Sequence, residues 1–259
     1  MLICLFDILY ACMNKILLRL IRLPRVALCV VGLVSLLLFV ILSKYEDRPF
    51  IRNLDFAVTV KVQEKIDRSA HLRLASFVDT MMTGTTFFAS PEFTSAVVII
   101  LTGLALYDRK KKSWNGKAFV ILTGFVAIVL VELYGKSIVH HPSPPFSMIK
   151  HATSIFPANY INEQFSYPSG HAARAVFVSI ISYLSFSIYH LALRKRLIFG
   201  LCLGSYVLLV SISRIYLGHH WFSDIIGGML ISSGFAFAVL TFAPVDGQDK
   251  PHYNRKVHE

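Results

Sequence analysis

Long apolar runs constrain the fold of this chain more than any other feature. An α-helix rises about 1.5 Å per residue, so about twenty apolar residues cross a hydrocarbon core of about 30 Å. Apolar runs on the order of that length lie at residues 26–42, 91–107, 117–139, 172–193, 197–212 and 222–242. The whole chain is 55% hydrophobic, which is more than a soluble core requires. We therefore predict an all-α, polytopic membrane bundle with about six transmembrane helices.

The segments between the runs divide the chain into five regions. Regularly spaced basic residues predict an amphipathic helix on the inner membrane surface at 1–25, before a first transmembrane helix at 26–43. Residues 44–90 predict an extracytoplasmic segment of amphipathic helices. Residues 91–243 predict a five-span bundle, and residues 244–259 a polar tail.

Local signals mark the start of the second span. Gly84, among threonines, predicts a break in the preceding helix. Ser90-Pro91-Glu92 then has the composition of a helix start, with a capping serine, a proline at the first helical position and an acid in the first turn. The four cysteines show no paired spacing and predict neither disulfides nor a metal site. Met13 is an alternative start of the chain.

Basic residues determine the predicted orientation. Lys and Arg are concentrated before residue 26, at 109–117, at 194–196 and in the tail, and are sparser in the segments on the other side. The positive-inside rule then places both termini in the cytoplasm. A net charge of +11 could indicate nucleic-acid binding, but acidic lipid headgroups explain basic residues along the inner face. We predict an integral protein of a bacterial inner membrane, with no nucleic-acid partner.

A polar stretch between the last two apolar runs carries the most reactive side chains. It reads SRIYLGHHWFSD at 213–224. Asp224 follows His220 by four residues, which puts both side chains on one face if the last helix starts here. A carboxylate beside an imidazole fixes the tautomer of the ring and leaves its other nitrogen free to attack or to carry a proton. Arg214 adds a permanent cation, so the stretch predicts an anion site, with phosphate as the favoured anion.

Two earlier segments supply complementary groups. YPSGH at 167–171 predicts a tight turn in which Gly170 can expose backbone N–H groups to an anion, and His171 provides a second imidazole. Lys136 stands at the end of the third predicted span. With the orientation above, all three segments meet at the outer leaflet. Together they form a set of groups for phosphoryl transfer that contains no metal-binding carboxylate cluster.

These residues resemble the type 2 phosphatidic-acid phosphatase superfamily, which also contains the vanadium haloperoxidases. The family pattern has three pieces, Lys-x6-Arg-Pro, Pro-Ser-Gly-His and Ser-Arg-x5-His-x3-Asp. The resemblance covers roughly residues 75–245. Its second piece matches in full at 168–171, and its third matches in full at Ser213, Arg214, His220 and Asp224.

The first piece of the pattern matches only in part. Lys136 and Pro144 fit it, but Ser143 stands at the arginine position. A missing guanidinium removes a bidentate phosphate contact. We expect Arg174, on the same helix face as His171, to replace part of that contact, or else His141. The alternative for Arg174 is that its side chain simply extends to the membrane interface.

The resemblance implies an integral membrane phosphatase that acts on a lipid phosphate monoester or pyrophosphate at the outer leaflet. In the mechanism it implies, His220 attacks phosphorus to form a phosphohistidine while Asp224 holds the other ring nitrogen. His171 protonates the leaving alkoxide and then activates the hydrolytic water. No metal ion or other cofactor is implied. The residues that would hold the phosphate oxygens are Lys136, Ser169, Gly170, Arg214 and Arg174.

Other functions are compatible with the same residues. In a phosphotransferase a second hydroxyl would accept the phosphoryl group, and Ser143 makes a catalytically silent phospholipid-binding relative conceivable. A haloperoxidase is disfavoured because those relatives are soluble. Single residues also have structural explanations; Lys136, for example, could merely pair with Glu132 one turn earlier. We favour the phosphatase because the residues occur together at the family spacing.

Overall fold

The computed structural model describes residues 25–69, 72–108, 113–150, 165–184 and 192–242. The prediction of an all-α chain is confirmed, since the two strands within these ranges hold only two residues each. The predicted N-terminal basic helix, apart from Arg25, and the polar tail lie outside the described residues. The elements are α2 (Arg25–Tyr45), α3 (Pro49–Ser69), α4 (Leu72–Phe87), α5 (Pro91–Leu106), β1 (Tyr107–Asp108), β2 (Ser113–Trp114), η1 (Gly116–Ala118), α6 (Phe119–Ile138), η2 (Phe146–Met148), α7 (Gly170–Ser182), α9 (Leu193–Tyr216) and α10 (Phe222–Phe242).

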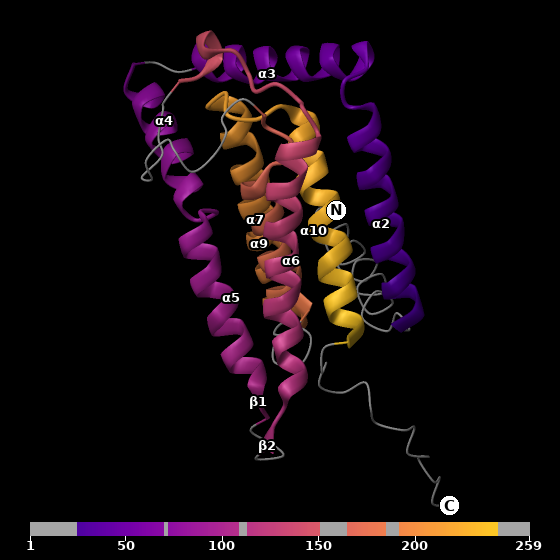
Figure 1. The fold of residues 1–259 in the computed structure, drawn as a ribbon. Helices are drawn as coiled ribbons and strands as arrows, with labels where there is room; N and C mark the ends of the chain where they lie inside the picture. The colour runs from indigo at the N-terminus through magenta and orange to yellow at the C-terminus, as the bar shows by residue number, and fades with distance from the viewer. Residues whose placement is uncertain (1–24, 70–71, 109–112, 151–164, 185–191, 243–259) are drawn as a thin grey trace, which may run out of the picture.

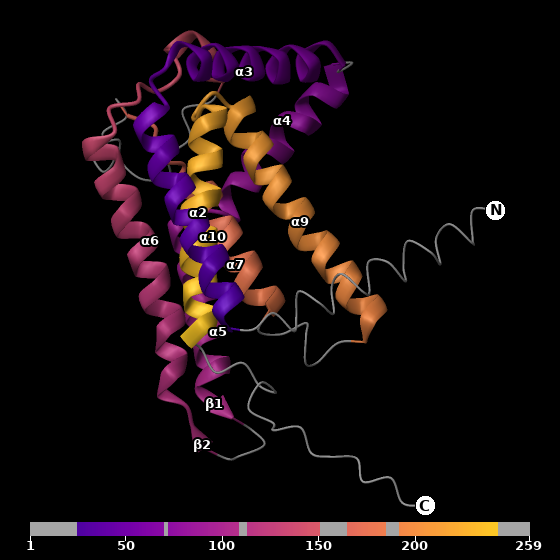
Figure 2. The same ribbon diagram turned by 90° about the vertical axis from the view of Figure 1, so that its right-hand side faces the viewer.

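Most of the helices run side by side, and α3 lies across one end of the bundle (Figures 1 and 2). α10 packs against α2, α6 and α7. α3 covers the end at which α2 finishes and α10 begins, and α4 leads from α3 back along the bundle to α5. The short β1–β2 ribbon lies at the opposite end. The end covered by α3 is called the α3 end below.

Four described helices are long and apolar enough to cross a membrane, namely α2, α6 together with η1, α9 and α10. A further candidate is a broken span, in which residues 77–87 and α5 are bent by 51° at a short gap. Within the described residues α7 is a shorter apolar helix. These helices support an integral membrane protein. The count of six spans and the cytoplasmic position of both termini stay predictions.

The helix break expected at Gly84 is wrong. α4 continues through this position to Phe87, and no atom lies within 4 Å of where a Cβ on Gly84 would stand. A single glycine costs a helix only about 1 kcal/mol, and the hydroxyl of Thr85 adds a bond to the carbonyl of Met81 one turn earlier, at 2.6 Å. The break comes just before Pro91. There Ser90 caps α5, as predicted, because its hydroxyl accepts a hydrogen bond from the N–H of Phe93 at 3.3 Å.

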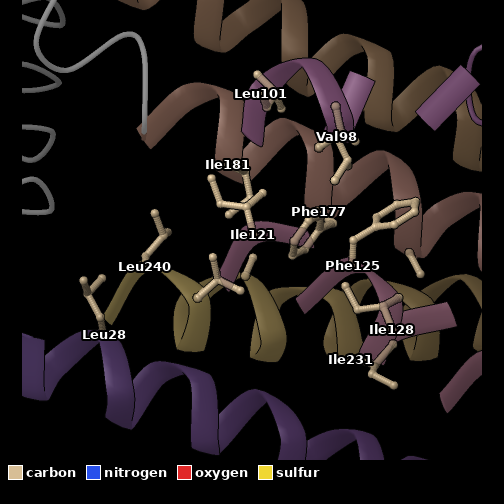
Figure 3. Close-up of a cluster of buried hydrophobic side chains, with 14 residues drawn as sticks. Leu28, Val98, Leu101, Ile121, Phe125, Ile128, Phe177, Ile181, Ile231 and Leu240 are labelled. Atoms are coloured by element: carbon tan, nitrogen blue, oxygen red, sulfur yellow. The ribbon is translucent and has the colours of Figure 1, made fainter. Parts of the chain in front are cut away.

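The main apolar core lies between α5, α6, α7 and α10 (Figure 3). The rings of Phe125 and Phe177 lie 5.9 Å apart, and Ile128, Ile181 and Ile231 are buried around them. Aliphatic and aromatic side chains from several helices are buried against one another here. This packing fixes the helices whose α3 ends carry the polar residues described next.

Small residues bring α10 unusually close to α7. A Cβ on Gly228 would stand 2.4 Å from the carbonyl oxygen of Ser169, a distance that no side chain could tolerate. One turn further on, the hydroxyl of Ser232 donates to the carbonyl of Ala173 at 2.5 Å. Small and hydroxylated residues serve this purpose between membrane helices. The start of α7 is thereby held against the first turns of α10.

Candidate active site

Three loop segments meet at the α3 end of the bundle (Figures 1 and 2). The first follows α6, the second leads into α7, and the third joins α9 to α10. Backbone hydrogen bonds link them: the N–H of Ser169 donates to Asp224 O at 3.0 Å, the N–H of Ser166 to His141 O at 3.0 Å, and the N–H of Lys150 to Leu217 O at 3.1 Å. The three sequence motifs therefore form one site.

A glycine turn directs the third motif into this site. α9 ends at Tyr216, and Gly218 follows with a φ of +71°, the left-handed conformation that often terminates a helix. The N–H of His219 then bonds back to the carbonyl of Arg214 at 3.1 Å. A side chain on Gly218 would also collide with the carbonyl of Met148. The turn brings His220 back over the start of α10.

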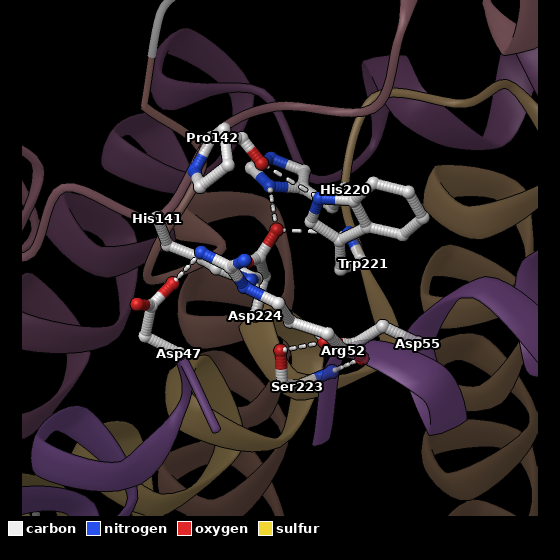
Figure 4. A network of polar contacts seen from close by, with 9 residues as sticks. All are labelled: Asp47, Arg52, Asp55, His141, Pro142, His220, Trp221, Ser223 and Asp224. Atoms are coloured by element: carbon white, nitrogen blue, oxygen red, sulfur yellow. Dashed lines mark hydrogen bonds and ion pairs between the residues drawn. The ribbon is translucent and has the colours of Figure 1, made fainter. Parts of the chain in front are cut away.

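The predicted pair of His220 and Asp224 is present and buried (Figure 4). His220 Nδ1 lies 3.4 Å from Asp224 Oδ2, which is longer than a well-formed hydrogen bond. The same carboxylate oxygen accepts the backbone N–H of Trp221 at 2.8 Å. Because Nδ1 faces the carboxylate, Nε2 is the ring nitrogen left to react.

The surroundings of His220 favour its neutral form. Burial is the largest influence and lowers the pKa of this imidazole below its ordinary value of 6.5, and the cations Arg214 and Lys136 lower it further. The carboxylate of Asp224 acts in the opposite direction without cancelling these effects. A neutral imidazole at neutral pH carries the free electron pair that a nucleophile needs.

His141 occupies a position that the sequence did not predict. Its Nδ1 donates to Asp224 Oδ1 at 2.9 Å, so this histidine makes a shorter contact with the carboxylate than His220 does. Its Nε2 lies 3.8 Å from Asp55 Oδ2 on α3. His141 was one of two candidates to replace the missing arginine, and the structure shows it engaged with Asp224.

Asp55 is the acidic residue that sequence reasoning missed. It is buried, and its carboxylate accepts the N–H and the hydroxyl of Ser223, both at 2.7 Å (Figure 4). One signal could have found it, because Asp55 stands between Leu54 and Phe56 in an otherwise apolar part of its segment. A lone acid there predicts a specific buried partner.

The side chains of Ser169 and Arg214 each carry a hydrogen-bond donor without a partner among the described residues. Among the described residues, neither Ser169 Oγ nor Arg214 Nε has a partner, although both atoms are fully buried. Arg214 makes one long contact, from Nη1 to the hydroxyl of Thr86 at 3.4 Å. Unpaired buried donors are costly and uncommon, so they point to a ligand that accepts hydrogen bonds.

Lys136 and Arg174 both contact Glu132. Lys136 Nζ lies 3.2 Å from one carboxylate oxygen, and an Nη of Arg174 lies 2.6 Å from the other. The pairing of Lys136 with Glu132, weighed above as a structural alternative, is thus present. Arg174 also donates to the carbonyl of Ala89 at 3.3 Å and is only 4% exposed, so it does not extend to the membrane interface.

Gly170 lies directly against this ion-pair network. A Cβ on Gly170 would stand about 2 Å from the Glu132 carboxylate oxygens, which therefore face the first turn of α7. His171 follows, half-buried, and interacts electrostatically with His220 and Arg214. The structure thus brings together all the residues predicted to act on or hold a phosphate. Which of them contact substrate stays a prediction.

Cationic and hydroxyl side chains predominate among the residues that surround His220, and such groups bind anions. Among the described residues, no group of three or more His, Cys, Asp or Glu side chains is arranged to hold a metal. Ser143, at the position where the family has arginine, is half-buried in the loop after α6.

Comparisons with known proteins agree with this geometry. A family model described as the PAP2 superfamily matches residues 116–247. Phosphatidylglycerophosphatase B of Bacillus subtilis (strain 168) is 29% identical over 192 residues, which cover 72% of this chain and 83% of the relative. These are similarities, and the substrate in that relative's name belongs to the relative.

Two crystal structures share the fold. A transmembrane PAP2 type phosphatidylglycerolphosphate phosphatase from Bacillus subtilis superposes with a TM-score of 0.64 at 22% identity, covering 82% of this chain and 94% of that chain. LpxE of Aquifex aeolicus superposes with a TM-score of 0.50 at 19% identity, covering 72% of this chain and 94% of that chain. At such identities the likeness supports the arrangement of the helices alone.

Proposed function

The chain belongs to the PAP2 superfamily, and on that basis we propose that it is a membrane lipid phosphatase that hydrolyses a phosphate monoester or pyrophosphate at the outer leaflet. The observation that supports this most directly is the meeting of three motifs around His220. There, two buried donors, Ser169 Oγ and Arg214 Nε, have no partner among the described residues. A tetrahedral phosphate with several acceptor oxygens fits such donors.

In the proposed reaction His220 is the nucleophile. Its Nε2 attacks the terminal phosphorus, the bond from that phosphorus to the oxygen on the lipid side breaks, and His171 gives a proton to that oxygen. The group that departs is the lipid alkoxide of a monoester or the lipid phosphate of a pyrophosphate. His171 then takes a proton from water, which attacks the phosphohistidine and releases inorganic phosphate. Asp224 holds Nδ1 of His220 and stabilises the positive charge that the ring acquires.

Fixed donors would stabilise the charge of the transition state. Ser169, the N–H of Gly170 and Arg214 face the non-bridging oxygens in this proposal, together with Lys136 and Arg174. Such preorganised donors can do the work that a metal ion does in other phosphatases. We therefore propose that the reaction needs no metal ion.

The substrate lies in the membrane in this proposal. The Bacillus relative is a phosphatidylglycerophosphatase by name, so phosphatidylglycerol phosphate is the first lipid to test. Undecaprenyl pyrophosphate, phosphatidic acid and lipid A complete the panel. Each presents a phosphate at the depth where the α3 end of the bundle would meet the outer headgroup region.

The test is phosphate release by the detergent-purified protein from this panel in excess EDTA. We expect release that survives the chelator and is abolished in His220→Ala.

The matched control is His140→Ala. His140 is an exposed histidine that contacts Phe165 and has no part in the proposed reaction. When a reaction with phosphate-labelled lipid is quenched during turnover, the label should be found on His220, in a phosphoenzyme that is labile in acid and stable in base. Turnover that requires a divalent metal, or that persists in His220→Ala, would refute the mechanism.

A phosphotransferase differs from this proposal in one observable. It would release little phosphate until an acceptor lipid with a free hydroxyl is added, and would then transfer the label to that lipid. A silent binding protein would do neither, but would bind the lipid in a flotation assay.

Orientation is tested separately in intact cells. We propose that the α3 end faces the periplasm or exterior, with both termini in the cytoplasm. A cysteine at Ser147, exposed in the loop after α6, should react with a membrane-impermeant maleimide. A cysteine at Lys117, near the opposite end, should react only after lysis. The reverse pattern would contradict the proposed outer-leaflet site.

A further inference from the structure

We propose that His141 is a positioning residue for His220, acting through the Asp224 carboxylate that the two histidines share. This inference rests on the proposed function, because it assumes that His220 is the nucleophile. Asp224 has no exposed surface, and His141 is 2% exposed. His141 therefore lies behind the carboxylate and acts through it.

The argument begins with the two oxygens of the carboxylate. Oδ1 accepts from His141 at 2.9 Å, and Oδ2 accepts from the backbone N–H of Trp221 at 2.8 Å. A carboxylate held at both oxygens cannot turn about its χ2 torsion. Its remaining interaction, the 3.4 Å contact with His220 Nδ1, then has a fixed direction. Outer partners orient the groups that bind reacting atoms in many active sites.

His141 is itself fixed from several sides. The indole N–H of Trp221 donates to the carbonyl of Pro142 at 2.7 Å (Figure 4). The carbonyl of His141 accepts the N–H of Ser166 at 3.0 Å. The ring of Tyr167 packs edge-on at 6.4 Å. The loop after α6 therefore presents the imidazole to Asp224 in one orientation.

The second nitrogen of His141 links the site to α3. It lies 3.8 Å from Asp55, whose carboxylate is held by the N–H and hydroxyl of Ser223. Asp55, His141, Asp224 and His220 thus form a continuous chain of alternating acids and imidazoles. The chain explains why an acid of the covering helix is buried against the start of α10.

The charge of His141 is part of this arrangement. The titratable groups that face it are Asp224 on α10, Asp55 on α3, Glu46 just after α2 and the phenol of Tyr167. Burial by itself lowers the pKa of His141, but the hydrogen bond to Asp224 and the three carboxylates outweigh burial and raise the pKa above 6.5. A positive charge between Asp55 and Asp224 reduces the repulsion between these carboxylates.

Three variants separate positioning from simple structural support. His141→Ala removes the donor to Asp224. His141→Asn keeps an amide N–H close to the place of Nδ1 but can neither ionise nor reach Asp55. His140→Asn is the matched control, because it makes the same substitution at the neighbouring exposed histidine. Each is assayed for kcat and KM over a range of pH, with the lipid that the wild type hydrolyses fastest.

We expect His141→Ala to lower kcat by about 10- to 100-fold, by analogy with the loss seen when the hydrogen-bond partners of metal-ligating residues are removed. KM should change by less than about threefold, since His141 touches no substrate in this proposal. His141→Asn should have a kcat within about fivefold of the wild-type value. Because asparagine does not ionise, the kcat of this variant should also lack the change with pH that the wild type shows when His141 loses its proton. His140→Asn should be unchanged.

Several results would overturn the inference. They are a wild-type kcat in His141→Ala, a rise in KM with unchanged kcat, or an Asn variant as impaired as the Ala variant. An equal loss of thermal stability and activity in Ala and Asn would mean that the residue only supports the fold.

A chemical measurement tests the role of His141 without depending on the proposed function. Diethyl pyrocarbonate modifies neutral imidazole nitrogens, and mass spectrometry measures how fast it modifies His220 in the absence of any lipid. We expect that rate to change by about threefold or more in His141→Ala and to stay near the wild-type rate in His141→Asn, because the hydrogen bond at one nitrogen determines the state of the other. If the wild type releases no phosphate from any lipid, the proposed function fails, and this rate alone decides the role of His141.

Discussion

Arg174 of α7 donates to Glu132 of α6 at 2.6 Å, in an ion pair whose two side chains are 4% and 9% exposed. Lys136 shares the same carboxylate at 3.2 Å. The sequence suggested Arg174 as a substitute for a missing phosphate-binding arginine, and Lys136 as a phosphate ligand. In the structure both cations contact an acid of the chain itself, Glu132, which lies close to Gly170. Glu132 therefore either prepares these cations for the substrate or competes with it.

The Glu132 network should contribute strongly to stability. Glu132→Gln leaves the buried Arg174 and the partly buried Lys136 without their counter-charge, which we expect to lower the free energy of unfolding by about 3 to 5 kcal/mol. The control is Glu64→Gln, which breaks an exposed ion pair with Arg68 and should change it by at most about 1 kcal/mol. Thermal unfolding in detergent measures both. If both variants lowered the free energy of unfolding equally, burial would not strengthen the contacts of Glu132 with Arg174 and Lys136.

A double-mutant cycle should reveal what Arg174 does. We expect Arg174→Ala to lower kcat/KM by at least about tenfold, because a charge-assisted phosphate contact is worth more than 1.4 kcal/mol. If Arg174 acts only by neutralising Glu132, the double variant Glu132→Ala/Arg174→Ala should regain activity. We expect no recovery, since the phosphate would still lack the guanidinium. Full recovery would assign Arg174 a purely structural role.

Ser143→Arg should strengthen phosphate binding. The substitution restores the arginine of the family pattern, and we expect it to lower the inhibition constant for inorganic phosphate by at least about tenfold. Ser147→Arg is the matched control, because it adds the same charge at an exposed position of the same loop. If both variants gain equally, the effect is general electrostatic attraction and does not depend on position 143.

Gly228→Ala tests the close approach of α7 and α10. Its Cβ would stand 2.4 Å from Ser169 O and 3.2 Å from the N–H nitrogen of Ala173, so one helix must move. We expect a loss of about 1 to 3 kcal/mol in stability and a lower kcat, because the shift separates Ser169 from Asp224. Gly204→Ala on α9 points into open space and should be neutral or slightly stabilising. If Gly228→Ala had the melting temperature of the wild type, the two helices would be able to move apart at no cost in stability.

The pH dependence of stability should report on His141. Its pKa is raised in the folded protein above 6.5, so its contribution to stability is fully present below pH 6.5 and is lost as the pH rises through the raised pKa. Burial also raises the pKa of Asp55, but that group remains in the variant used for comparison. We therefore expect the stabilities of wild type and His141→Asn to differ most below pH 6.5 and to approach each other as the pH rises through the raised pKa of His141. A constant difference in melting temperature across this range would contradict the raised pKa.

Much of the site could be predicted from the sequence because its chemistry is local. His220 and Asp224 are one helical turn apart, and Ser169, Gly170 and His171 are adjacent, so each group forms once its own helix starts. The apolar runs likewise predicted the long helices, since length and composition alone decide whether a helix can cross a membrane. The error at Gly84 shows the limit of such signals, because one glycine is too weak to end a helix that its neighbours support.

The partners across the bundle could not be predicted. Nothing local indicates that Asp55 binds Ser223, that His141 binds Asp224, or that Glu132 holds Arg174. Each of these contacts joins different elements, and its distance depends on how closely the helices pack. The packing in turn depends on positions such as Gly228, where the lack of a side chain admits the backbone of Ser169.

The sequence by itself therefore determined the helical membrane class, the family and the residues able to carry the chemistry, because these follow from composition, periodicity and spacing along the chain. The tertiary structure alone decided which charges meet. A buried carboxylate must find a donor, and only the packed bundle decides that Asp224 finds His141 as well as His220, and that Lys136 and Arg174 find the same acid.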